Sequence, residues 1–128
     1  MKRAECQIAD FHLATGTPIL DKPEFPSQER IDLRHRLIEE EWIEYQEAVA
    51  ARDIVEVADA IGDMIVVLVG TALEFGIPLS EVWDEIHRSN MAKVDPDTGF
   101  VRRRDDGKIL KPEGWTPPDI ASVLKVFG

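Results

Sequence analysis

Acidic side chains on two neighbouring predicted helices are the residues of this chain best suited to chemistry. They form an E-E-x-x-E group and a second group spaced by helical turns: Glu40, Glu41, Glu44, Glu56, Asp59 and Asp63. Most other residues in these segments are apolar, and an ionised carboxylate withdrawn from water without a partner costs several kcal/mol. Carboxylates directed toward an apolar interior therefore predict a site for a multiply charged cation.

Helical spacing directs both groups inward. A helix advances about 100° per residue, which places Glu41 and Glu44 inside the apolar arc around Leu37 and Glu40 at its margin. The three acidic residues of the second group fall within about 60° of one another. A single acidic run is usually a solvated helix face, but here both helices carry one. If the helices pack antiparallel, the like charges raise one another's pKa unless a cation lies between them.

The ligand types favour Mg²⁺, with Mn²⁺ as a substitute, because all are hard carboxylate oxygens without cysteine or histidine. A di-iron centre needs two carboxylate–histidine pairs, and only Asp84 and His87 form one. The histidines lack the spacing of a zinc site, and we expect His12, His35 and His87 at the surface. No G-x-x-x-x-G-K phosphate loop is present.

Capping residues predict the helices that carry the carboxylates. Ser27 begins a helix over residues 28–51, and Asp53 begins one that runs to about residue 74. Gly76 ends the latter in the left-handed conformation, and Ser80 caps a helix that ends near residue 90. A shorter helix is expected over residues 4–14. The apolar stretch 64–70 predicts a helix segment buried on all sides.

The C-terminal part predicts a different structure. Asp106 and Gly107 form a turn signal between residues 100–104 and 108–111, which predicts a small β-hairpin. Prolines predict extended arms, with a last helical turn over residues 119–127. The expected fold class is all-α: an antiparallel helical bundle completed by homo-oligomerisation, with a small C-terminal β-hairpin and extended arms.

Length and charge limit the possible functions. The 128 residues predict a single domain, residues 1–128, and the net charge of −10 argues against a nucleic-acid polymer as partner. The lone Cys6 excludes a disulfide framework and predicts a cytoplasmic location, without a secretory signal. No apolar run approaches the ~20 residues of a membrane span, so no membrane partner is expected.

Several motifs together resemble the MazG-type all-α nucleotide pyrophosphohydrolases, whose signature is E-x-x-E followed by E-x-x-D. Residues 37–44 and 56–63 carry that signature. Residues 70–77, 87–93, 106–112 and 117–119 resemble the phosphoribosyl-ATP pyrophosphohydrolase-like branch. The resemblance covers roughly residues 30–119.

The resemblance implies Mg²⁺-dependent cleavage of a nucleoside triphosphate into a monophosphate and pyrophosphate by a helical homo-oligomer. It implies Glu41, Glu44, Glu56 and Asp59 as ligands. Glu40 is then a further ligand or the residue that activates water, a role open to Glu41 as well. In some relatives the aspartate directly precedes the apolar run, which is the place of Asp63. We favour Glu56 and Asp59 as direct ligands. Asp63 is then either a residue that supports the direct ligands without touching the ion or an alternate ligand.

Basic residues near the C-terminal part are candidates for substrate binding. Phosphate contacts are expected from Arg88, Lys93 and either Lys108 or Lys111, and Asn90 is a candidate reader of the base or sugar. Trp42 or Trp115 could stack on a base, although packing in an interface is the stronger explanation for Trp42.

Three functions compete. The first is a nucleotide pyrophosphohydrolase that controls nucleotide pools, and the second is phosphoribosyl-ATP pyrophosphohydrolase of histidine biosynthesis. The third is a helical dimerisation module without catalysis. An apolar face formed by Ile31, Ile38, Trp42 and Val49 predicts a homodimer, or a dimer of dimers.

Overall fold

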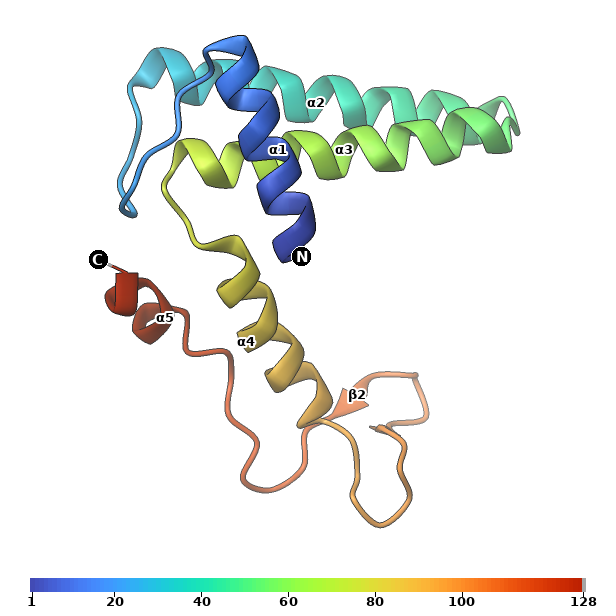
Figure 1. The fold of residues 1–128 in the computed structure, drawn as a ribbon. Helices are drawn as coiled ribbons and strands as arrows, with labels where there is room; N and C mark the ends of the chain where they lie inside the picture. Colours follow the sequence, from blue (N-terminus) through green and yellow to red (C-terminus); the bar gives the residue numbers. More distant parts are fainter. Residues whose placement is uncertain (128) are drawn as a thin grey trace. The chain divides into compact units, whose positions relative to one another are not determined.

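Two units make up the chain in the computed structural model, which describes residues 1–127. The first is Met1–Leu79, and the second begins at Ser80. The described residues form five helices and a two-stranded sheet: α1 (Lys2–Thr15), α2 (Gln28–Ala50), α3 (Ile54–Glu74), α4 (Leu79–Met91), β1 (Arg102–Arg103), β2 (Ile109–Leu110) and α5 (Ile120–Phe127). The expectation of a mostly helical chain with a small hairpin is confirmed (Figure 1).

Local hydrogen bonds explain where the first three helices begin and end. The Ser27 hydroxyl accepts from the backbone N–H of Arg30 at 3.3 Å, and Asp53 accepts from the first turn of α3. Gly16 and Gly76 follow α1 and α3 with φ of 70° and 66°. Gly76 has a second reason to lack a side chain, because a Cβ there would collide with the carbonyl of Lys22. These caps confirm the predicted helix boundaries in this unit.

In the first unit, α2 and α3 lie side by side and antiparallel, joined by a short turn (Figure 1). Helix α1 packs against α3 and runs across the pair rather than along it. The proline-rich segment after α1 then follows the end of α3. There the N–H groups of Leu20 and Glu24 donate to the carbonyls of Leu73 and Phe75, both at 3.0 Å.

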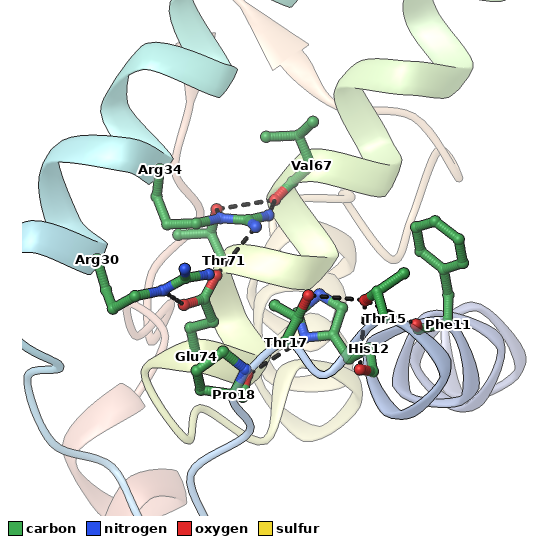
Figure 2. Close-up of polar contacts among 10 residues, drawn as sticks. All are labelled: Phe11, His12, Thr15, Thr17, Pro18, Arg30, Arg34, Val67, Thr71 and Glu74. Carbon is green, nitrogen blue, oxygen red and sulfur yellow. Dashed lines mark hydrogen bonds and ion pairs between the residues drawn. The ribbon is translucent and has the colours of Figure 1, made fainter.

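A buried ion network joins α2 to α3 (Figure 2). Glu74 is fully buried, and its two oxygens pair with Arg30 Nε at 2.7 Å and with Arg34 Nη1 at 2.9 Å. Arg34 also donates from Nε to Thr71 Oγ1 at 3.0 Å and from Nη2 to the Val67 carbonyl at 2.8 Å. Each nitrogen of the buried Arg34 guanidinium thus has a partner on α3. Removing one partner from a buried ion pair costs about 3–5 kcal/mol.

His12 packs beside this network, and the expectation that it is a surface residue is wrong. The side chain is 4% exposed, and its Nδ1 donates to the Pro18 carbonyl at 3.3 Å. Gly70 makes room for it: a Cβ there would lie 2.8 Å from His12 Nε2 and 2.6 Å from Arg34 Nη2. The pKa of His12 is lowered, first by burial and further by the charges of Arg34 and Arg30, despite Pro18 and Glu74.

The apolar core within one chain is small. The buried hydrophobic residues are Ala48, Ala60, Val69 and Ala72. The expectation that residues 64–70 are buried on all sides is wrong for the single chain, because Ile65, Val66 and Leu68 are 40–51% exposed. Helix α3 packs on α2 and α1, and several of its large apolar side chains stay exposed.

The second unit contains α4, the hairpin and α5. Ser80 does not cap α4 as predicted, because the helix already begins at Leu79 and the Ser80 hydroxyl bonds Glu81 at 2.9 Å. The hairpin is antiparallel, with Arg103 opposite Ile109, and Gly107 adopts φ 88° in its turn. Where a single last helical turn was predicted, the structure has the helix α5. Asp119 holds its first turn by accepting hydrogen bonds from the backbone N–H and the hydroxyl of Ser122.

None of the helices that the structure describes is by itself long and apolar enough to cross a membrane; only α3 and α4 taken together meet that length and composition.

The buried His12 makes the stability of the fold depend on pH. Its folded-state pKa lies below the ordinary 6.5, so the unfolded chain binds the proton more readily and stability falls as pH drops below 6.5. We expect the melting temperature to fall on acidification, because this residue can lower the free energy of unfolding by up to about 1.4 kcal/mol per pH unit. His12→Gln should flatten the slope, whereas His35→Gln, at an exposed position, should not. Equal slopes for the wild type and His12→Gln would contradict this account.

Candidate metal centre

Three predicted ligands meet between α2 and α3: Glu41, Glu44 and Asp63. One carboxylate oxygen of each lies within 4.8 Å of the others. Glu41 and Asp63 are half-buried, and Glu44 is exposed. Two of the carboxylates come from α2 and one from α3, so the group exists only when the helices pack in this register.

The buried ion network explains that register. Arg34 on α2 lies opposite Thr71 on α3. Two turns further along α2 is Glu41, and about two turns back along α3 is Asp63. Antiparallel helices therefore place these two carboxylates opposite each other once Arg34 has bound its partners.

Electrostatics in the group favour a bound cation. Burial raises the pKa of Glu41, and the neighbouring carboxylates of Glu44, Asp63 and Glu40 raise it further. In addition, Glu41 Oε2 is buried without a hydrogen-bond partner. A buried acceptor that lacks a donor, set among like charges, fits a hard cation such as Mg²⁺.

The other two predicted ligands lie outside this group. Glu56 and Asp59 are exposed and line a cavity of about 270 Å³ at the end of the helix pair near the α2–α3 turn. The remaining lining residues are Glu44, Glu47, Ala48, Ala51, Asp53 and Ala60. Glu44 therefore belongs both to the carboxylate group and to the cavity. Ala60, the residue one turn before Asp63, is buried and contributes no ligand.

Helix α2 also places two of the remaining candidates. Glu40 is exposed beside the group and acts on Glu41 through its charge. Trp42 is 51% exposed and stacks on Tyr45 with ring centroids 5.7 Å apart. Neither residue contacts the other carboxylates as a hydrogen-bond partner in the part of the chain that the structure describes.

The proposed substrate-binding residues belong to the second unit. The Arg88 guanidinium is paired with Glu85 at 2.8 Å, whereas Lys93 Nζ donates to Asn90 Oδ1 at 3.1 Å. Lys111 Nζ lies over the ring of Trp115 at 4.4 Å from its centroid.

Lys108 lies in the hairpin turn, where its backbone N–H donates to Asp106. Of the five candidate residues, Lys93, Lys108 and Lys111 thus have side-chain charges that no carboxylate of the described chain pairs, while Arg88 is already paired.

Comparison with known proteins agrees with this helical architecture. No curated protein matches the chain. The model of one protein family, phosphoribosyl-ATP pyrophosphohydrolase, matches residues 8–90. The match covers more than half of the chain and includes both helices that carry the carboxylate group. The chain therefore belongs to the phosphoribosyl-ATP pyrophosphohydrolase family, within the MazG-like all-α nucleoside triphosphate pyrophosphohydrolase superfamily.

Proposed function

We propose that this protein hydrolyses a nucleoside triphosphate, with a ribose or deoxyribose sugar, to the monophosphate and pyrophosphate in a Mg²⁺-dependent reaction. The family implies a pyrophosphohydrolase, a hydrolase that acts on phosphoric anhydrides. The observation that carries the proposed metal dependence is the group of Glu41, Glu44 and Asp63. Control of nucleotide pools is the role that we assign to the reaction.

The proposed ligands are Glu41, Glu44 and Asp63, with Glu56 and Asp59 on the neighbouring cavity available to a further cation. We move Asp63 into the first position because its carboxylate joins the group, while Asp59 does not. A Mg²⁺ held by these carboxylates would supply charge to polarise phosphoryl oxygens and to lower the pKa of a water. We propose Glu40, or Glu41 itself, as the group that accepts the proton of the attacking water.

We favour attack of water at the α-phosphorus, which breaks the bond between the α-phosphate and the leaving pyrophosphate. Pyrophosphate is a better leaving group than a nucleoside alkoxide, and its charge is stabilised by the same cation. The absence of a phosphate loop also argues against a γ-phosphate hydrolase. Lys93, Lys111, Lys108, Arg88 and Asn90 are proposed to contact the substrate.

Phosphoribosyl-ATP is a second candidate substrate, which the description of the matching family favours. It is cleaved at the same kind of bond, so the carboxylate group serves either substrate. A dimerisation module without catalysis is the alternative of another class.

A nucleotide panel tests the proposed activity. Ribo- and deoxyribonucleoside triphosphates and phosphoribosyl-ATP are incubated with Mg²⁺ in ¹⁸O-labelled water. We expect pyrophosphate release, the label in the monophosphate, Mn²⁺ as a substitute and no turnover with chelator. Ca²⁺, which accepts looser coordination, should bind and support little turnover. Orthophosphate as the first product would refute the mechanism, and inactivity toward the whole panel would favour the module.

Variants of single carboxylates test which residues are the metal ligands. Glu41→Gln and Asp63→Asn should each reduce turnover by about 100-fold or more. Both should hold or raise the melting temperature of the metal-free protein, because each removes one of several repelling charges. Asp59→Asn is the matched control and should cost much less. An equal loss at Asp59, with none at Asp63, would return the ligand position to Asp59.

Association with further copies of the chain completes the proposal. Large apolar side chains are exposed along one line of α3, at Ile61, Ile65 and Leu68, each 43–51% exposed. On α2, Trp42 and Val49 are 51% and 40% exposed. Few hydrophobic residues are buried within one chain. Pairing these exposed faces with a second copy would bury most of the remaining apolar surface. We propose a homodimer, or a dimer of dimers.

Sedimentation of the wild type and of one charged variant tests the assembly. We expect a dimer or tetramer at micromolar concentration, and a shift toward monomer in Leu68→Glu because the charge cannot be buried in the interface. Phe100→Glu, at a 76% exposed position of the second unit, is the control. A wild type that sediments as a single monomeric species would contradict the proposal.

A further inference from the structure

Two lysine ammonium groups converge on one indole ring in the second unit. Lys93 Nζ lies 5.7 Å from the centroid of the Trp115 ring, and Lys111 Nζ lies 4.4 Å from it. The two lysines come from distant places in the sequence, one just after α4 and the other just after β2. Attraction between a cation and an aromatic face explains why each ammonium lies there.

The ring of Trp115 is tied to α4 by a hydrogen bond. Its Nε1 donates to the Ser89 carbonyl at 2.8 Å, which ties the ring to the last turn of α4. Ser89 is 1% exposed, and its hydroxyl donates to the Thr116 carbonyl at 3.3 Å. Lys93 is oriented as well, because its Nζ donates to Asn90 Oδ1 at 3.1 Å.

The positive charges of this pair are uncompensated. No carboxylate in the described part of the chain lies within ion-pair distance of Lys93 or Lys111, although acidic residues outnumber basic ones by 25 to 15. Two ammonium groups near one ring repel each other, and the asparagine that accepts from Lys93 carries no charge. An anion with two adjacent charges would relieve that repulsion and complete both hydrogen-bonding shells.

We propose that Lys93 and Lys111, held on Trp115, form a metal-independent site for the linked phosphates of a di- or triphosphate. Because two ammonium groups already lie against its ring, we assign Trp115 to placing the lysines rather than to stacking on a nucleotide. Lys93, Lys111 and Trp115 themselves lie outside residues 8–90, which the family model matches. That its natural ligand is the nucleotide substrate or the pyrophosphate product rests on the proposed function.

Binding of inorganic pyrophosphate to the full-length protein in excess chelator tests the site directly. Equilibrium dialysis with labelled pyrophosphate should show saturable binding that weakens with salt. The double variant Lys93→Gln, Lys111→Gln should bind at least about tenfold more weakly, because two charge-assisted contacts are lost. The matched control, Lys22→Gln with Lys125→Gln, removes the same charge from two other exposed lysines and should bind like the wild type.

Asp63→Asn separates this inference from the proposed activity. That variant should lose Mg²⁺-dependent turnover and still bind pyrophosphate in chelator as the wild type does. Lysine-dependent binding in a protein without turnover would leave the anion site standing and refute the proposed activity. Absence of saturable binding by the wild type, or equal binding by the two double variants, would overturn the anion site.

Discussion

The guanidinium of Arg34 is the contact on which the arrangement of the first unit depends. It leaves α2 and bonds a backbone carbonyl, a hydroxyl and a carboxylate on α3. Apolar side chains tolerate small shifts between packed helices, whereas a buried guanidinium with three fixed partners does not. Shifting α2 by one turn along α3 would leave Glu74 buried without its counter-charge and would separate Glu41 from Asp63.

The ion network holds the helices in register while the carboxylate group repels itself. The carboxylates of Glu41, Glu44 and Asp63 repel one another, so the group cannot hold itself together without a cation. The ion network of Arg30, Arg34 and Glu74 lies about two turns away and fixes the register of the two helices. A cation bound here would meet a site that is already assembled, and it would stabilise the protein by relieving the repulsion between the carboxylates.

Much of the first unit follows from the sequence, because helix ends depend on local chemistry. Ser27, Asp53 and Gly76 predict three boundaries correctly. The placement of Glu41 and Glu44 on one side of α2 also follows from spacing alone. The same geometry places Arg34 in the arc of Glu41 and Glu44, at about +60° from Leu37, so the sequence also indicates that Arg34 is buried.

Tertiary register was beyond sequence reasoning. The spacing of Asp59 and Asp63 cannot decide which of the two faces α2, since both lie on the same side of α3. The pairing of Arg34 with Glu74 decides it, and the two residues are 40 positions apart. The burial of His12 likewise depends on how α1 docks, which its weakly patterned sequence does not specify.

Locating a bound Mn²⁺ by its anomalous X-ray scattering, in crystals of the wild-type protein, tests the central claim most directly. The account predicts an anomalous peak within coordination distance, about 2.2 Å, of oxygens from Glu41, Glu44 and Asp63. A peak coordinated by Glu56 and Asp59 alone, or crystals without a peak between α2 and α3 at saturating Mn²⁺, would contradict it.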